Sequence, residues 1–342
     1  MVYSVSMRAK LIVVSVLALG LALPAVAWRY RIYDLGSVDG FSRAWGVTES
    51  GMVVGAPAFF WTEQRGMWFA QPRFFAGQAD VFNCVNELGE AAGDTTWHVG
   101  GRIKTNQPFF WSPQTGFTLL PFLTGYVQGY CYGVNDRSQV VGTMFGPAGQ
   151  AAFFWSRPAG TVDMGRFDPR FGAIATDVNE GGEACGTAGN SPNGFARAFR
   201  WTQGTGLVDL GVLPTFTESF GEAINDQGEI VGTCFKSGTE VTFRARRGEQ
   251  MTNALPLFPG FVAPYDINEQ GWFCGVSHSV FGQFAALCLN DGTVIDIAAN
   301  ADGGTGGLSL IQATGLNERG DVCGTAERPD RRLRAFFAKR LD

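Results

Sequence analysis

The chain has 342 residues, of which 45% are hydrophobic and 47 are glycine, and its formal net charge at pH 7 is −5. This hydrophobic content is too high for an intrinsically disordered chain, and the many glycines indicate a globular protein rich in β-strands and turns. A mildly acidic chain with scattered arginines is also not expected to bind nucleic acid.

The first 27 residues have the layout of a secretory signal peptide. Two basic residues precede an apolar run from Leu11 to Leu23, which is short for a membrane span, and Ala27 ends a small-x-small cleavage signal. An uncleaved membrane anchor is the alternative interpretation. We expect cleavage after Ala27 and a secreted protein, extracellular or periplasmic, whose mature chain (residues 28–342) has no membrane span.

The mature sequence is organised around a short segment that occurs seven times. Its clearest copy, residues 223–233, reads Ala-Ile-Asn-Asp-Gln-Gly-Glu-Ile-Val-Gly-Thr and predicts two short strands joined by a tight turn. Asn225 can hydrogen-bond within this turn, and Gly228 can supply the positive φ that closes a three-residue hairpin. The third copy has Ser138 in place of that glycine, so its hairpin is expected to be the most strained.

The seven copies end in glycines spaced about 40–50 residues apart, a repeat length typical of propeller blades. These closing glycines are Gly55, Gly93, Gly142, Gly186, Gly232, Gly275 and Gly324. Each copy is followed by a third strand, which is aromatic in most copies, such as residues 152–155 (Ala-Phe-Phe-Trp), and several by a fourth, such as residues 208–211 (Val-Asp-Leu-Gly). The pattern predicts an all-β, seven-bladed β-propeller of four-stranded blades.

The seventh copy reaches the C-terminus without a fourth strand. Residues 33–36 (Tyr-Asp-Leu-Gly) match the fourth strand at residues 208–211. We therefore predict that an N-terminal strand, within residues 30–36, completes the last blade and closes the ring, which removes two open sheet edges. Residues 28–342 would then form a single propeller domain.

Three of the seven cysteines occupy positions where other copies have valine, which predicts buried thiols that pack as small hydrophobes: Cys185, Cys274 and Cys323. The sequence leaves undecided whether one disulfide forms among the four less regular cysteines: Cys84, Cys131, Cys234 and Cys288. No zinc-ligand spacing is present, and the Asp-rich turns lack the alternating oxygen ligands of a calcium loop. We therefore predict no metal and no cofactor.

Three stretches together resemble the bacterial extracellular HAF repeat family. They are residues 224–232 (Ile-Asn-Asp-Gln-Gly-Glu-Ile-Val-Gly), residues 198–201 (Ala-Phe-Arg-Trp) and residues 207–211 (Leu-Val-Asp-Leu-Gly). The resemblance covers essentially the whole mature chain, although Arg197 stands at the position of the eponymous histidine. It implies a propeller-like, secreted or surface-displayed repeat protein, and it carries over no catalytic residue.

Ligand sites on such scaffolds lie on loops held by a rigid frame. The Asn-Asp turns lie on one face, so we predict binding on the opposite face, whose connections are longer and include the loop at residues 95–104. Its candidate ligand-binding residues, aromatic platforms and polar groups suited to a sugar or a peptide, are Trp97, His98, Arg102, Tyr126, Tyr130, Phe216 and Tyr265. Alternatively, the aromatics pack blade against blade, because burying one contributes at most about 4–6 kcal/mol.

Two functions fit this sequence. The first is a secreted binding or scaffold module for an envelope polysaccharide or an extracellular protein, and the second is an extracellular hydrolase or lyase acting on a polysaccharide at the channel mouth. No nucleophile-histidine arrangement is visible, so no catalytic residue is predicted, while a two-carboxylate glycosidase site stays open. Clustered carboxylates in the channel would favour the enzyme, and an aromatic, uncharged mouth would favour binding.

Overall fold

The computed structural model describes residues 28–37, 39–70, 80–99, 102–147, 149–190, 194–258, 260–279 and 282–341. These ranges contain 28 β-strands and no helix, so none of the described segments is a helix that could cross a membrane. The signal peptide predicted at residues 1–27 lies outside the described residues.

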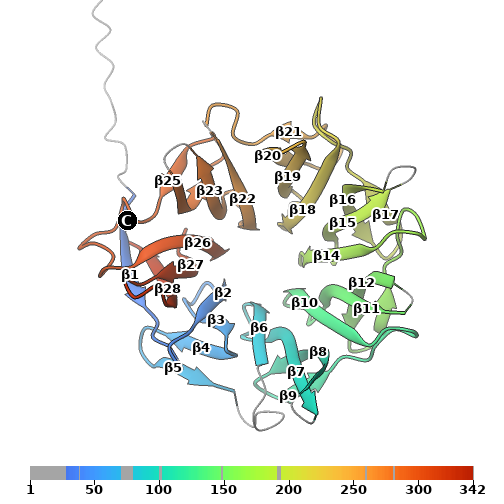
Figure 1. Ribbon diagram of the computed structural model, residues 1–342, viewed down its shortest axis with the longest axis horizontal. Helices are drawn as coiled ribbons and strands as arrows, with labels where there is room; N and C mark the ends of the chain where they lie inside the picture. The colour runs from blue at the N-terminus through green and yellow to red at the C-terminus, as the bar shows by residue number, and fades with distance from the viewer. Residues whose placement is uncertain are drawn as a thin grey trace, which may run out of the picture.

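The strands form seven four-stranded antiparallel sheets arranged as blades around a central axis (Figure 1). Blades 1 to 6 consist of four consecutive strands each, beginning at β2, β6, β10, β14, β18 and β22, and blade 7 consists of β26, β27, β28 and β1. The predicted seven-bladed β-propeller is therefore confirmed. In each blade the first strand lies nearest the axis (Figure 1).

The innermost strands are β2 (Arg43–Val47), β6 (Asp80–Val85), β10 (Gln128–Val134), β14 (Ala173–Val178), β18 (Glu218–Ile224), β22 (Gly260–Ile267) and β26 (Ser309–Leu316). The second strands are β3 (Val53–Ala56), β7 (Ala91–Val99), β11 (Val140–Gly146), β15 (Ala184–Asn190), β19 (Ile230–Lys236), β23 (Phe273–Ser279) and β27 (Val322–Glu327). The third strands are β4 (Phe59–Thr62), β8 (Arg102–Ser112), β12 (Gly149–Ser156), β16 (Phe195–Thr202), β20 (Thr239–Ala245), β24 (Gly282–Cys288) and β28 (Leu333–Arg340). The outermost strands are β5 (Gly66–Phe69), β9 (Gly116–Leu119), β13 (Gly160–Asp163), β17 (Gly206–Asp209), β21 (Thr252–Asn253), β25 (Val294–Asp296) and β1 (Tyr30–Asp34).

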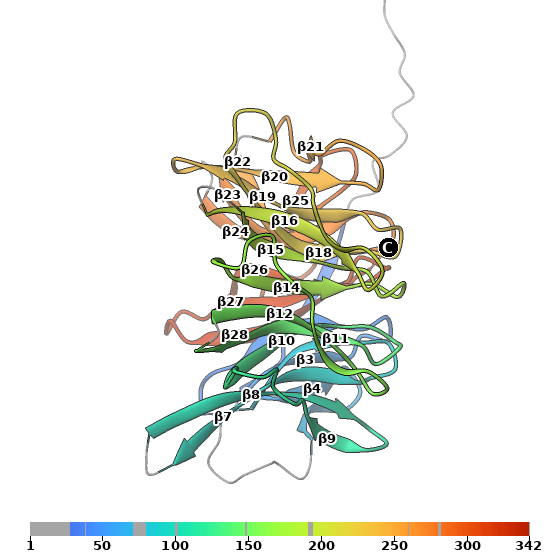
Figure 2. The ribbon, with the colours of Figure 1, turned by 90° about the vertical axis from the view of Figure 1, so that its right-hand side faces the viewer.

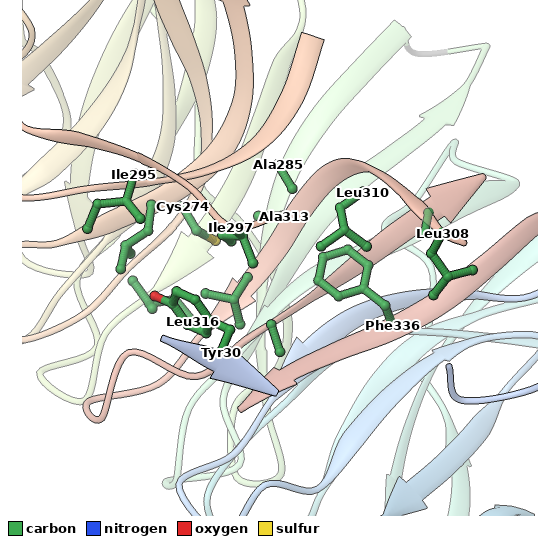
Figure 3. Close-up of a cluster of buried hydrophobic side chains, with 14 residues drawn as sticks. Tyr30, Cys274, Ala285, Ile295, Ile297, Leu308, Leu310, Ala313, Leu316 and Phe336 are labelled. Atoms are coloured by element: carbon green, nitrogen blue, oxygen red, sulfur yellow. The ribbon is translucent and has the colours of Figure 1, made fainter. Parts of the chain in front are cut away.

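The N-terminal strand closes the ring, as predicted. β1 pairs antiparallel with β28, with Tyr30 opposite Arg340 and Asp34 opposite Phe336. Tyr30 is fully buried in the cluster between blades 6 and 7, where it lies beside Leu316 (Figure 3). The first described strand thus supplies core as well as the outer edge of the last blade.

The core is divided into seven clusters of buried hydrophobic side chains, each spanning two neighbouring blades. In six blades the aromatic strand has a fully buried phenylalanine opposite the closing glycine: Phe59, Phe109, Phe153, Phe199, Phe243 and Phe336. Each is worth about 1.5–3 kcal/mol by burial, so the aromatic repeat is explained by packing between blades.

The repeated hairpin has the geometry expected from its sequence. The Gly228 amide donates to the Asn225 carbonyl (2.9 Å), the Glu229 amide donates to the Asn225 side-chain oxygen (2.8 Å), and Gly228 has a φ of 74°. Ser138 is forced to a φ of 56° at the equivalent position, as predicted. A non-glycine residue there carries about 1–3 kcal/mol of strain.

All seven cysteines are free thiols. Cys185, Cys274 and Cys323 are fully buried, which confirms that they pack like the valines they replace. The disulfide that the sequence left open among the other four does not form, since Cys84, Cys131, Cys234 and Cys288 are also free thiols. Burial raises the pKa of the Cys131 and Cys185 thiols well above the ordinary value.

Candidate binding site in the central channel

Every innermost strand contains a β-bulge at the same place. In each blade the register against the second strand skips the residue three positions before the Asn (or Thr48) that opens the turn, and β26 has a second shift between Leu310 and Gln312. The skipped residues are Trp45, Asn83, Tyr132, Thr176, Glu222, Tyr265 and Thr314. A bulge redirects a side chain, and here all seven line one cavity on the axis.

The bulge explains why each repeat ends in glycine. In every blade, a Cβ on the closing glycine would overlap a backbone carbonyl oxygen of the bulged strand, as for Gly232 and the Phe220 carbonyl. Only glycine permits that approach of two backbones. The bulge therefore accounts both for the glycine that recurs in each repeat and for the side chain that each blade directs into the channel.

The cavity has a volume of about 570 Å³. Its walls include four aromatic residues: Trp45, Tyr130, Tyr132 and Tyr265. Tyr132 and Tyr265 are 38% and 42% exposed although both are on innermost strands, so their rings face open space at the axis. This volume is within the range of about 300–1,000 Å³ typical of small-ligand sites.

Three of the bulge residues are used to join blades. Asn83 donates to the Cys131 carbonyl (3.0 Å), and Thr176 and Thr314 donate in the same way to the carbonyls of Gly221 (3.0 Å) and Ala44 (2.9 Å). Each acceptor precedes the bulge of the next blade. Tyr265 also bonds to the next blade, through the Gln312 side chain on β26. Trp45, Tyr132 and Glu222 make no such bond in the described part of the chain.

Two cavity carboxylates are also engaged by backbone amides. Asp177 accepts the amide of Val178 (2.8 Å) and that of Ile224 in the next blade (2.9 Å). Asp266 accepts the amides of Ile267 and Leu316, both at 2.8 Å. Burial dominates these hydrogen bonds and raises the pKa of Asp177 to about 6 and that of Asp266 to about 8.

A third carboxylate, Asp94 on β7, is held by side-chain amides. Its two oxygens accept hydrogen bonds from Asn83 (2.9 Å) and Asn106 (3.1 Å). Burial raises its pKa to about 6 in spite of these bonds. Asp94 therefore stabilises the second blade and has little capacity left for a ligand.

Glu222 differs from the other cavity carboxylates. Within the described residues it has no hydrogen-bond or ion-pair partner, although it is partly buried at the apex of the β18 bulge and lines the cavity. Burial alone raises its pKa from the ordinary 4.5 to about 7. An unpartnered carboxyl group in a cavity is a candidate for ligand contact.

The turn face carries two hydrogen-bonded rings around the same axis. In six blades the turn Asn donates to the carbonyl of the equivalent residue in the next blade, for example Asn225 to Asn268 (3.0 Å). In all seven, the following acidic residue accepts the amide of its counterpart in the preceding blade: Glu49, Glu87, Asp136, Glu180, Asp226, Glu269 and Glu318. Burial and the neighbouring carboxylates raise the pKa of Glu87 and Glu318.

The structure separates the seven predicted site residues into three groups. Tyr130 and Tyr265 line the cavity. Tyr126 is buried and accepts a hydrogen bond from Arg166 (3.0 Å), and Phe216 packs in the cluster between blades 4 and 5. These two aromatics therefore pack blade against blade, which was the alternative to ligand binding.

The remaining three predicted residues, Trp97, His98 and Arg102, lie in the β7–β8 hairpin. The backbone there is paired, with Trp97 opposite Thr105 and Val99 opposite Arg102, so the predicted loop at residues 95–104 is mostly strand. The side chains of these three residues lie outside the described part. Figure 2 shows β7 and β8 extending beyond the other strands on the side away from the turns.

Sequence reasoning missed Trp45, Tyr132 and Glu222. The signal that could have found them is the position three residues before each turn Asn, which reads Trp, Asn, Tyr, Thr, Glu, Tyr and Thr in the seven copies. The flanking positions keep small or aliphatic residues in most copies. Large chemical variation at one position of a regular repeat indicates a side chain released from packing.

The described residues contain no group of three or more His, Cys, Asp or Glu side chains that could hold a metal ion. No Ser-His-Asp arrangement is formed among them either, because His278 stacks on Phe261, with ring centroids 4.7 Å apart, and bonds Gln283. The described lining of the cavity consists of polar, aromatic and small aliphatic residues.

No protein-family model and no curated protein matches this sequence. The chain is similar in structure to a catalytically inactive virginiamycin B lyase from Staphylococcus aureus solved with quinupristin, with 10% identity, a TM-score of 0.57, and 92% of this chain and 100% of that one covered. It is also similar to the β-propeller domain of the Trilobed protease from Pyrococcus furiosus, with 9% identity, a TM-score of 0.53, and 90% and 97% covered. The fold is shared. At identities this low, the activities and ligands of these proteins cannot be assigned to this chain. The resemblance to HAF repeats stays a prediction.

Proposed function

We propose that this chain is an exported binding module that holds a carbohydrate in its central cavity. The observation that carries the proposal is the cavity itself, about 570 Å³ in volume and walled by Trp45, Tyr130, Tyr132 and Tyr265 beside polar groups. A pyranose has an apolar face that can stack on such rings and hydroxyl groups that need polar partners. Small-ligand sites combine these two kinds of surface.

The proposed location is outside the cytoplasm, either extracellular or periplasmic. It is supported by the signal-like sequence of residues 1–27 and by the resemblance to secreted HAF repeats. An envelope polysaccharide is then the natural source of the ligand, and an extracellular protein is the broader alternative.

We place the entrance on the face opposite the Asn turns. The turn face is tied together by the two hydrogen-bonded rings, whereas the opposite face carries the long β7–β8 hairpin (Figure 2). Longer connections on a rigid frame provide contacts for parts of a chain that extend beyond the cavity.

The second candidate function is an extracellular hydrolase or lyase, and one observation favours it. The Glu222 carboxyl group is unpartnered in the described residues and has a pKa of about 7, in the range suited to a general acid or base. Glycosidases need a second carboxyl group, and Asp94, Asp177 and Asp266 are all bound by amides. Binding is therefore the better supported function.

The test is to titrate the mature protein with oligosaccharides of neutral, acidic and amino sugars by calorimetry, and to analyse each mixture for products. We expect retention without turnover, and Tyr265→Ala or Tyr132→Ala should weaken binding about tenfold or more, since a stacked ring contributes on the order of 1 kcal/mol beyond its buried area. Phe195→Ala is the matched control, because Phe195 is an exposed aromatic outside the cavity. Turnover would favour the enzyme, and no binding to any sugar would reject the proposal.

A further inference from the structure

The central cavity carries an excess of negative charge. Its lining contains Asp94, Asp177, Glu222 and Asp266, and none of its described lining residues is basic. Arg43, on the same strand as Trp45, directs its guanidinium over the Phe41 ring at 5.6 Å. A concave site lined by one sign of charge concentrates ligands of the opposite sign.

The carboxyl group available to a ligand is that of Glu222. The carboxylates of Asp94, Asp177 and Asp266 already accept hydrogen bonds from protein amides, whereas Glu222 accepts none in the described chain. The ring order places Thr176 and Tyr265 on either side of it and blades 1 and 2, with Trp45 and Asn83, across the axis (Figure 1). Glu222 therefore faces a space bounded by aromatic rings.

Aromatic rings around one carboxylate are the combination that recognises an organic cation. The electron-rich faces of Trp and Tyr attract an ammonium group at about 0.5–2 kcal/mol per contact, and the carboxylate supplies a charge-assisted hydrogen bond. The open faces of Tyr132 and Tyr265 lie in the same cavity as the carboxylate. A neutral or anionic sugar would leave Glu222 without a complementary partner.

Resting on the carbohydrate-binding function proposed above, we infer that the cavity selects an amino sugar with a free, protonated amine. The amine lies on the Glu222 carboxylate, and the pyranose ring stacks on Tyr265 or Tyr132. The N-acetylated form of the same sugar lacks the positive charge and adds an acetyl group against the carboxylate. The inferred ligand class is a de-N-acetylated amino-sugar oligomer.

The experiment compares the disaccharide of glucosamine with its N,N′-diacetyl counterpart, both titrated at pH 7 into wild type and Glu222→Gln. We expect wild type to bind the free amine at least about tenfold more tightly, and Glu222→Gln to remove that preference while keeping the weaker affinity for the acetylated sugar. Glu218→Gln is the matched control on the same strand, because Glu218 contacts the Ala196 amide (3.3 Å) and does not line the cavity. Its preference should equal that of wild type.

The possible outcomes separate this inference from the broader proposal. Equal or tighter binding of the acetylated disaccharide, or a preference that persists in folded Glu222→Gln, overturns amine selection and leaves carbohydrate binding standing. Binding of neither disaccharide, together with none of the other sugars, overturns both. Thermal unfolding of each variant confirms that the compared proteins are folded.

Discussion

At the scale of single residues, the closing glycines carry the most structural information. Each lies where a bulged strand brings its backbone against the second strand, so a side chain has no room. In blade 5 a Cβ on Gly232 would overlap the Phe220 carbonyl and lie 2.7 Å from the Phe243 ring. The glycine is thus required by the same bulge that turns Glu222 into the cavity.

We predict that Gly232→Ala lowers the free energy of unfolding by about 3 kcal/mol or more, because backbone would have to move within a packed blade. Denaturant unfolding measures the change. Gly204→Ala is the control, since a Cβ there meets nothing within 4 Å and should change stability little. Equal effects of the two substitutions would contradict the proposed role of the glycine.

The cavity carboxylates predict how stability depends on pH. Burial raises the pKa of Glu222 from 4.5 to about 7 and that of Asp266 from 3.8 to about 8. Each group binds its proton more tightly in the folded state, so its stabilising contribution is present below its unfolded pKa and is lost as the pH rises through the folded value.

We therefore expect the free energy of unfolding to fall between about pH 4 and about pH 8, and Glu222→Gln to reduce that fall, because glutamine carries no ionisable proton. Chemical denaturation at several pH values measures both slopes. Stability that is constant or rises over this interval in wild type would show that the cavity carboxylates are not buried as described.

Part of the site could be predicted from residue types alone. The sequence selects Tyr130 and Tyr265 as aromatic residues of the connections opposite the turns, whereas the structure places them on β10 and β22. The same reasoning selects Tyr126 and Phe216, which pack between blades. Glu222 was missed because a bulge breaks the two-residue alternation from which side-chain direction is inferred. The type of a residue shows that its side chain could stack on a ligand. The local backbone determines the direction in which that side chain points.

At the scale of elements, the repeated strands made the blades predictable. The hairpin, the aromatic strand and the match between residues 33–36 and residues 208–211 gave the blade number and the ring closure, because each follows from local turn and packing rules. The extension of β7 and β8 was not predicted. Its sequence, residues 95–104, is polar and lacks the apolar alternation of the other strands, and pairing with the neighbouring strand overrides that composition.

Ring closure by β1 predicts that the mature protein without residues 28–37 aggregates or fails to fold cooperatively. The deletion exposes the edge of β28 and removes the buried Tyr30 and Leu35 side chains. Size-exclusion chromatography and thermal unfolding measure the outcome. A synthetic peptide of residues 28–37 should restore some soluble, cooperative protein, whereas a monomeric deletion variant that folds by itself would contradict the closure.

At the scale of the whole molecule, the turn face is a nearly symmetric hydrogen-bonded ring with one interruption. Six turn asparagines reach the carbonyl of the next blade, and Thr48 in blade 1 takes the seventh position with a side chain that bonds the Met52 amide of its own turn (3.1 Å). The hydrogen bond missing from this ring is therefore the one that an asparagine in place of Thr48 would donate to the Asn86 carbonyl of blade 2.

We predict that Thr48→Asn completes the ring and raises the free energy of unfolding by about 0.5–1.5 kcal/mol, the net value of one hydrogen bond. The reciprocal Asn225→Thr should lower it by a similar or larger amount, because it removes the bond to the Asn268 carbonyl. Denaturant unfolding measures both variants. If neither substitution changes stability, the ring contributes nothing to holding the blades together.

The central claim is that the ligand site lies on the propeller axis and not on the outer loops. A crystal structure with the bound glucosamine disaccharide tests it most directly, since it locates the sugar without reference to any variant. The account predicts sugar density between Glu222, Tyr132 and Tyr265. Density confined to outer loops such as the tip of the β7–β8 hairpin, with the axial cavity holding only water, would contradict it.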